Sequence, residues 1–363
     1  MASPRLTGKR VLLTGGSSGV GLAATRILAD EGARMVVLAR RADELRERLA
    51  EQDIAADVIH VDLADRDRVE AAVEEAVATL GGLDILVSNA GAAVFGHFQE
   101  VHPDDFDRTL DVTFKGAVDV IRAGLPHLRE TRGTIVATGS LMTRVPLPTW
   151  SSYAAAKHAL RGFLNTLAIE EREQNSGVRI AMVHPGPIDT PLFAQASSST
   201  GHKPRIPPDA YRAEVVAQAL VEMAVRPRRE VVLGGFTLSV DLLYAHARPV
   251  ADAVLLMIDR WYRSGTEQAP APGSLWSVDN LPPVISGKIP ARDSFLAPLQ
   301  LGRRMPFARD TPLRLASNLV KAAAKGAQMP RALLRVVPEQ PAPARPQRTA
   351  AEDPGPRPAT VHV

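Results

Sequence analysis

The chain has 363 residues, of which 45% are hydrophobic and 23% are charged. This length favours about two domains, and the composition is that of a globular protein rather than a disordered one. There is no cysteine, which excludes a disulfide scaffold, a thiolate-bound metal and a cysteine nucleophile. The formal net charge of +3 is too balanced for a chain that is strongly adapted to nucleic acid.

The chain shows no targeting or membrane-spanning pattern. Residues 1–8 are polar and lack the apolar core of a signal peptide. No stretch reaches the roughly 18 apolar residues that a spanning helix needs. We therefore expect a soluble, cytoplasmic protein.

The first 235 residues alternate short aliphatic runs, typical of buried parallel strands, with helical patterns. This order implies right-handed crossovers and a Rossmann-like, doubly wound parallel sheet of about seven strands flanked by helices. The predicted strands are Arg10–Leu13, Met35–Ala39, Val58–Val61, Ile85–Ser88, Thr134–Thr138, Arg179–Val183 and Val231–Leu233. The predicted helices include Gly21–Asp30, Asp67–Leu80, Asp104–Leu128 and Ser152–Glu173.

Beyond residue 235 the pattern changes. Residues 236–263 are predicted to be helical with an interruption near Pro249, residues 264–312 are rich in turns, and residues 311–337 return to helical spacing. Residues 338–363 are rich in Pro, Ala and Arg and are predicted to be disordered. The predicted organisation is therefore a domain over 1–235, a helical and irregular extension over 236–337, and a tail over 338–363.

Residues 286–337 carry ten Lys or Arg residues against two Asp residues. This basic, partly amphipathic segment could make peripheral contact with an anionic membrane. It could instead cover the protein's own surface or a neighbouring subunit, and we leave these alternatives open. Because it lacks interleaved aromatic residues, we expect no nucleic-acid partner.

The sequence TGGSSGVG at residues 14–21 lies where the first strand passes into the first helix. Gly15 permits a tight turn, and the helix that follows presents free N–H groups to phosphate. The spacing TGxxxGxG therefore predicts a dinucleotide-binding turn. Its residues are Gly15, Ser17, Ser18, Gly19, Val20 and Gly21.

The second predicted strand ends in Arg40-Arg41. Enzymes of this architecture that prefer NAD place a carboxylate near this position, to accept hydrogen bonds from the ribose 2′-hydroxyl. A guanidinium instead suits a 2′-phosphate. We therefore expect NADP(H), with Arg40 as the phosphate ligand and NAD(H) as the weaker alternative. A solvated arginine pair is the other interpretation, and Asp43 could weaken the preference.

Ser140, Tyr153 and Lys157 form the predicted catalytic set. Tyr153 and Lys157 are four residues apart on a predicted helix, so they share one face. We expect the Lys157 ammonium to lower the pKa of the Tyr153 phenol from its ordinary value of about 10. Tyr153 could then exchange a proton with the oxygen of a carbonyl or an alcohol, while Ser140 hydrogen-bonds the same oxygen.

Several ordered motifs resemble those of the short-chain dehydrogenase/reductase family: TGGSSGVG, Asn89-Ala90-Gly91, Ser140, YAAAK at 153–157 and HPGPIDTP at 184–191. The resemblance implies hydride transfer between a nicotinamide cofactor and a small-molecule carbonyl or alcohol. It also implies a homodimer or homotetramer, since family members often form these. The cofactor contacts that it implies come from Asp62, Leu63, Asn89, Ala90, Gly91, Tyr153, Lys157, Pro185, Gly186, Ile188 and Thr190.

One position departs from the family pattern. The family usually has an asparagine in a DVNxxG context, where it helps to hold a water of the proton relay, whereas this chain has Thr113. Thr113 could support a rearranged relay, or catalysis could be slow. The second option keeps open a catalytically weak NADP(H)-binding scaffold or sensor that acts through its extension.

The loops expected to face the substrate are apolar, which predicts an apolar carbonyl or alcohol unless several of these side chains pack against the extension. The histidines His97, His102 and His184 do not have the spacing of metal ligands, so we expect no metal site and treat them as structural or solvated. The apolar loop residues are Phe95, Phe98, Leu141, Met142, Val145, Trp150, Leu192 and Phe193.

Overall fold

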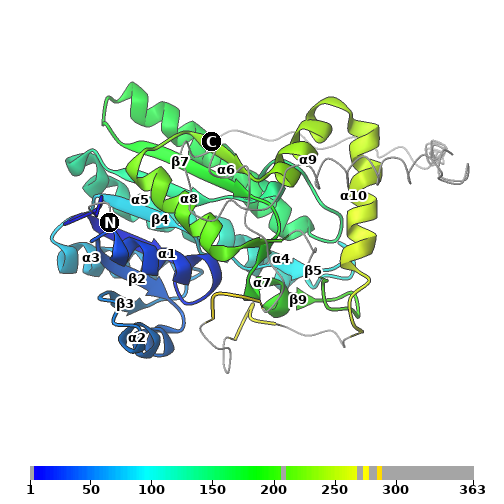
Figure 1. The fold of residues 1–363 in the computed structure, drawn as a ribbon, viewed down its shortest axis with the longest axis horizontal. Coiled ribbons are helices and arrows are strands. Elements are labelled where there is room, and N and C mark those ends of the chain that lie inside the picture. The colour runs from blue at the N-terminus through cyan, green and yellow to red at the C-terminus, as the bar shows by residue number, and fades with distance from the viewer. Residues whose placement is uncertain (1–3, 206–209, 268–272, 278–283, 288–363) are drawn as a thin grey trace, which may run out of the picture. The chain divides into compact units, whose positions relative to one another are not determined.

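The computed structural model describes residues 4–205, 210–267, 273–277 and 284–287 (Figure 1). All of them fall in the first of the two units into which the chain divides, residues 1–310. The predicted helical segment 311–337 and the tail 338–363 lie outside the described residues. The domain boundaries proposed at residues 235 and 337 stay predictions.

A seven-stranded parallel sheet runs through this unit in the order β11-β7-β6-β4-β1-β2-β3. The chain builds outward from β1 to β3 and then returns to pair β4 with the other side of β1. The prediction of a doubly wound parallel sheet of seven strands is therefore confirmed. The strands are β1 (Arg10–Thr14), β2 (Arg34–Ala39), β3 (Asp57–His60), β4 (Ile85–Ser88), β6 (Thr134–Thr138), β7 (Arg179–Pro185) and β11 (Glu230–Leu233).

Alternation along the strands divides the core between the two faces of the sheet. Val11 and Leu13 of β1 pack with α1 (Gly19–Asp30) and α8 (Ala213–Val225). The intervening Leu12 packs on the other face, in a cluster with residues of three helices. These are α3 (Arg66–Leu80), α5 (Gly116–Thr131) and α6 (Ser151–Glu173). Both faces are thus covered, which is why the strands read as continuous aliphatic runs.

The predicted helix Asp104–Leu128 is wrong in detail, because it consists of three pieces. These are α4 (Pro103–Leu110), a π-helical turn (Asp111–Lys115) and α5. The wide turn lets Gly116 approach the backbone after β3 closely, since an added Cβ there would lie 2.5 Å from the Leu63 carbonyl oxygen.

Two further helices were not among the predicted elements. Helix α2 (Ala42–Glu51) is short but amphipathic, since its buried residues Ala42, Leu45 and Leu49 share one face. Helix α8 buries most of its residues and shows no polar face, so no amphipathic pattern marks it.

The extension begins with two helices, α9 (Gly235–His246) and α10 (Arg248–Tyr262). Pro249 lies in the first turn of α10, so the predicted interruption is confirmed, and its cause is the missing proline N–H. Helix α10 contacts α7 (Pro191–Gln195) through an aromatic pair. There the ring of Tyr262 stacks on that of Phe193, with centroids 5.9 Å apart.

The extension shares an apolar cluster with the loops at the sheet edge. Trp150 is fully buried at its centre, with ring centroids 5.2 Å from Phe95 and 6.1 Å from Tyr262. Val240 and Leu255 of the extension belong to the same cluster. Several predicted loop residues therefore do pack against the extension, which was one of the two alternatives left open.

Truncation of the Trp150 side chain tests how much the apolar cluster contributes to the free energy of unfolding. Trp150→Ala should lower the free energy of unfolding by about 3–5 kcal/mol, because a large buried cavity is left. Trp150→Phe should cost less, because the indole N–H has no hydrogen-bond partner among the described residues. Urea denaturation of the three proteins makes the comparison. Equal losses for the alanine and phenylalanine variants would contradict a packing role.

Candidate active site

The candidate site lies at the carboxyl ends of the strands, beside the point between β1 and β4 where the strand order reverses. This is where open α/β sheets bind ligands. A cavity of about 490 Å³ opens there and is lined by eighteen of the predicted site residues. They are Gly15, Ser17, Ser18, Gly19, Val20, Arg40, Asp62, Leu63, Asn89, Ala90, Gly91, Ser140, Tyr153, Lys157, Pro185, Gly186, Ile188 and Thr190. The two others, Gly21 and Thr113, lie behind this surface.

The glycine turn (residues 14–21) packs directly on the turn that follows β4. Gly15 has a φ of +73°, and a Cβ there would lie 2.6 Å from the Cα of Ala90. Similarly, a Cβ on Gly21 would lie 2.0 Å from the Gly15 carbonyl oxygen. Only glycine fits at these positions, so the N-terminus of α1 is held against the cavity.

Asn89 ties three strand ends together. Its Nδ2 donates to the Gly15 carbonyl at 3.1 Å, and its Oδ1 accepts from the Thr138 hydroxyl at 3.0 Å. The hydroxyl oxygen of Thr14 accepts from the N–H groups of Asn89 and Ala90 at 3.1 and 3.2 Å. The ends of β1, β4 and β6 thus form one rigid frame.

The end of β2 presents two arginines to the nucleotide half of the cavity. Arg41 is buried and donates to the Ser17 hydroxyl at 3.2 Å. Arg40 donates to the carbonyl oxygens of Ser274 and Leu275, at 2.8 and 3.1 Å. Burial lowers the pKa of both guanidinium groups, which stay charged nonetheless. The alternative of a solvated arginine pair is therefore wrong.

Asp62 lies beside these arginines and is ionised. Burial favours its neutral form, but the Ala64 N–H and the Arg108 guanidinium together lower the pKa of its carboxyl group. The Ala64 N–H donates to Asp62 at 3.0 Å, and Arg108 forms an ion pair with it. Asp62 therefore presents acceptor oxygens at the nucleotide half of the cavity.

Tyr153 and Lys157 lie on α6 and are both buried. The Lys157 ammonium donates to the Thr138 carbonyl at 2.7 Å and lies 5.6 Å from the centre of the Tyr153 ring. Burial raises the pKa of Tyr153 to about 12, although its hydrogen bond with Ser140 opposes the shift. Burial also lowers the pKa of Lys157 to about 8. The predicted lowering of the tyrosine pKa is therefore wrong, because desolvation outweighs the hydrogen bond with Ser140.

Ser140 begins a short 3-10 turn over Leu141–Thr143. Its hydroxyl oxygen accepts from the Met142 N–H at 3.1 Å, and its own N–H donates to the Thr143 hydroxyl oxygen at 2.8 Å. Thr143 also donates to the Ser140 carbonyl. These bonds fix the serine side chain opposite Tyr153.

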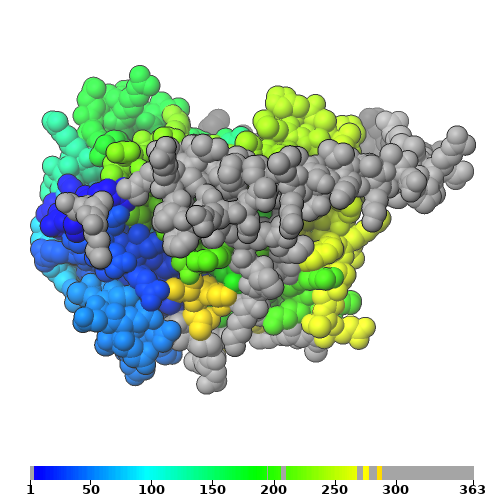
Figure 2. Space-filling view, viewed as in Figure 1, coloured from blue at the N-terminus to red at the C-terminus, as the bar shows by residue number. Residues whose placement is uncertain are grey.

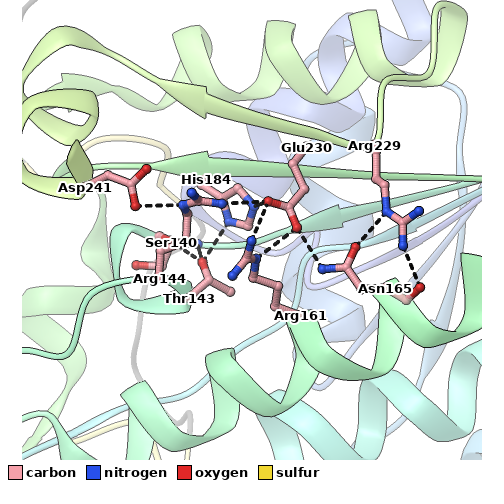
Figure 3. Close-up of polar contacts among 9 residues, drawn as sticks. All are labelled: Ser140, Thr143, Arg144, Arg161, Asn165, His184, Arg229, Glu230 and Asp241. Atoms are coloured by element: carbon pink, nitrogen blue, oxygen red, sulfur yellow. Dashed lines mark hydrogen bonds and ion pairs between the residues drawn. The ribbon is translucent and has the colours of Figure 1, made fainter. Parts of the chain in front are cut away.

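A network of polar side chains contacts this turn at Thr143 (Figure 3). His184 of β7 places Nδ1 2.8 Å from the Thr143 hydroxyl and Nε2 3.5 Å from Glu230 of β11. Glu230 also accepts from Arg144 and Arg161, at 2.8 and 2.9 Å. Sequence patterns gave no sign of this network, because its members are dispersed along the chain and meet only in the folded sheet.

The network fixes the charge states of its two central groups. Burial lowers the pKa of His184, so the imidazole is neutral at neutral pH. Burial of Glu230 favours its neutral form, but His184, Arg161 and Asn165 bring the pKa of its carboxyl group far below the ordinary value. His184 is therefore a structural link between Glu230 and the turn of Ser140, one of the two roles expected for it.

Thr113 has a structural partner rather than a place on the cavity wall. Its buried hydroxyl donates to the Ala92 carbonyl at 3.0 Å and accepts from the Ala92 N–H at 2.9 Å. These reciprocal bonds tie the π-helical turn to the segment after β4. The hydroxyl of Thr113 is thus engaged by the backbone.

The other half of the cavity is apolar. Six of the predicted loop residues line it, namely Leu141, Met142, Val145, Trp150, Leu192 and Phe193. Phe95 and Phe98 do not, since Phe95 is buried behind Trp150 and Phe98 is 70% exposed. The extension adds lining residues that the sequence did not reveal, because no local signal shows where a helix folds back. They are Phe236, Leu255, Met257, Ile258, Trp261 and Tyr262.

In the part of the chain that the structure describes, no helix combines the length and apolarity needed to cross a membrane. The fold, the glycine turn and the grouped Ser140, Tyr153 and Lys157 together define a nucleotide-binding oxidoreductase of the Rossmann type. Residues 9–201 match the family of short chain dehydrogenases. The chain belongs to this family, the short-chain dehydrogenase/reductases.

Known relatives agree with this assignment. The uncharacterized oxidoreductase YxnA of Bacillus subtilis is 32% identical over 247 residues, which span 66% of this chain and 69% of that protein. A short chain dehydrogenase from Burkholderia cenocepacia, solved in complex with NADP, is 33% identical with a TM-score of 0.54, covering 63% of this chain and 97% of that one. An alcohol dehydrogenase from Thermococcus sibiricus is 27% identical with a TM-score of 0.54, covering 62% and 96% respectively.

The ion pairs of Glu230 should contribute to stability. Glu230→Gln should lower the free energy of unfolding at pH 7 by about 2–3 kcal/mol, because the partly buried Arg161 loses its counter-charge and Arg144 keeps only Asp241. The folded pKa of Glu230 is depressed, so its contribution is present above the unfolded value near 4.5 and declines as pH falls below it. Urea denaturation across pH should therefore show the two proteins converging in acid.

The matched control is Glu51→Gln, which breaks an exposed pair with Arg48. This change should cost less than about 0.5 kcal/mol. A comparable loss in both variants, or a difference independent of pH, would contradict the role assigned to Glu230.

Proposed function

We propose that the protein is an NADP(H)-dependent oxidoreductase that acts on an apolar carbonyl compound or the corresponding alcohol. The observation that carries the proposal is the grouping of Ser140, Tyr153 and Lys157 in one cavity with the glycine turn. The nicotinamide coenzyme, when bound, supplies or accepts the hydride.

The nucleotide half of the cavity fits a phosphorylated dinucleotide. Gly15 and Gly21 let the turn pack tightly within the protein, which holds the N-terminus of α1 against the cavity, where its N–H groups can bind a pyrophosphate. Arg40, Arg41 and the Ser17 hydroxyl gather at the end of β2. Two guanidinium groups suit the extra 2′-phosphate of NADP.

Asp43 does not weaken this preference. Its side chain is 90% exposed and pairs with Arg46 at 2.5 Å, so its charge is already matched on the surface. The Burkholderia cenocepacia relative, solved with NADP, supports the same coenzyme for this chain.

Tyr153 is the proposed general acid in carbonyl reduction. With a pKa of about 12, its phenol carries a proton at neutral pH and can give it to the substrate oxygen. Lys157, with a pKa of about 8, remains charged at that pH and stabilises the phenolate that forms. Ser140 donates a hydrogen bond to the same substrate oxygen and fixes its position.

The apolar half of the cavity supports an apolar substrate. Its lining combines loop residues with Leu255, Trp261 and Tyr262 of α10. Because Ser140, Tyr153 and Lys157 line one cavity, we do not favour a catalytically weak scaffold. A homodimer or homotetramer and membrane contact through 286–337 remain predictions.

Coenzyme preference can be tested by titration with NADPH and NADH, followed by nicotinamide fluorescence. Arg40→Ala should weaken NADPH binding by about tenfold or more, because a charge-assisted bond to the 2′-phosphate is lost. Binding of NADH should change little. Arg46→Ala, an exposed position on α2, is the control. An equal loss for both nucleotides would count against Arg40 as the phosphate ligand.

Catalysis can be tested with a panel of apolar ketones and NADPH. Tyr153→Phe should retain NADPH binding and lose turnover by about 10²-fold or more, because the general acid is removed. In the wild type, reduction should slow as pH rises through about 8, where Lys157 loses its charge. Undiminished turnover by the variant would remove Tyr153 from the mechanism.

A further inference from the structure

Two short stretches of the extension, residues 273–277 and 284–287, lie beside the nucleotide half of the cavity. We call them together the strap. Figure 2 shows their yellow and orange atoms between the blue N-terminal part of the chain and the green part. Both stretches lie beyond residue 201, where the match to the family ends.

At the phosphate end, the strap occupies a donor of the glycine turn. The Val284 carbonyl accepts from the N–H of Gly19 at 2.9 Å, and Gly19 is the first residue of α1. N–H groups at this end of a helix are those that bind phosphate. A carbonyl oxygen and a phosphate oxygen are both acceptors, so they compete for this donor.

The same end of the strap is fastened across the turn. The Ser286 hydroxyl donates to Asp189 at 2.5 Å. The backbone of Gly287 passes so close that a Cβ there would lie 2.8 Å from both the Asp189 carboxylate and the Thr190 carbonyl. The strap therefore bridges α1 and the segment after β7.

At the adenosine end, the strap holds the arginines of the site. Arg40 donates to the carbonyls of Ser274 and Leu275, and Arg108 donates to Leu275 at 3.3 Å. The guanidinium of Arg108 also lies 5.2 Å from the ring centre of Trp276. Arg108 also pairs with Asp62. The strap therefore contacts the Arg40 guanidinium directly and the Asp62 carboxylate through Arg108.

Leu275 anchors the strap. Its side chain is 1% exposed and packs with Ala92 and Val112, next to Ala64. The Trp276 indole, in contrast, is half exposed and donates to Asp105 at 2.6 Å. Leu275 is therefore the buried anchor of the strap, and hydrogen bonds at the surface of the cavity supply the rest of its attachment.

We propose that the strap is the outer wall of the coenzyme site. It positions Arg40 and Arg108 at the adenosine end, and it must release Gly19 before a pyrophosphate binds. Coenzyme therefore enters and leaves at the rate at which the strap opens. This inference rests on the proposed function, because it requires a nicotinamide dinucleotide in this cavity.

Stopped-flow fluorescence with NADPH tests the proposal on the full chain. Leu275→Ala removes the anchor, and Ser286→Ala removes the bond to Asp189 without disturbing the core. In each variant the association and dissociation rate constants should both rise, by about three- to tenfold, while their ratio changes much less. Ile169→Ala, at a 61% exposed position on α6, should leave both constants unchanged.

The outcomes separate this inference from the proposed function. Faster dissociation with unchanged association would make the strap a simple contact and overturn the gating role, and unchanged rates would overturn it as well. If the wild type bound neither NADPH nor NADH, the proposed function itself would fail.

Discussion

The close approach of two turns is the constraint on which the rest of the site depends. The turn after β1 contacts the turn after β4 through Gly15 and Ala90, and the Asn89 amide bonds both Gly15 and Thr138. The Thr138 carbonyl in turn accepts from Lys157. One set of hydrogen bonds and contacts therefore connects the turn before α1 with Lys157 of α6 in the same frame.

Burial gives this frame its chemistry. The apolar cluster around Trp150, which includes Leu255 and Tyr262 of α10, packs against Tyr153, and both Tyr153 and Lys157 are buried. Desolvation moves the two pKa values apart, raising that of Tyr153 to about 12 and lowering that of Lys157 to about 8. A neutral phenol beside a cation suits the proton transfer proposed for Tyr153, so the helices of the extension would support that role through packing.

Short sequence patterns predicted the parts of the fold and of the site that depend on residues close together in the chain. The strands, the glycine turn and the spacing of Tyr153 and Lys157 follow from short runs of residues. The network of Glu230 and His184, and the lining by Trp261, depend on contacts between segments far apart in the chain. The direction of the tyrosine pKa shift was missed for the same reason, because the sequence shows a nearby charge but not the depth of burial.

The extension connects the two halves of the site through α7. Phe193 of this short helix lines the apolar half and stacks on Tyr262 of α10. The carbonyl of Gln195, at its other end, accepts from the N–H of Ser274 in the strap at 2.7 Å. If the strap opens as proposed, this hydrogen bond would link its movement to α7, which lines the apolar half of the cavity. Because α10 and the strap both belong to the extension, one segment of the chain contacts both halves of the cavity.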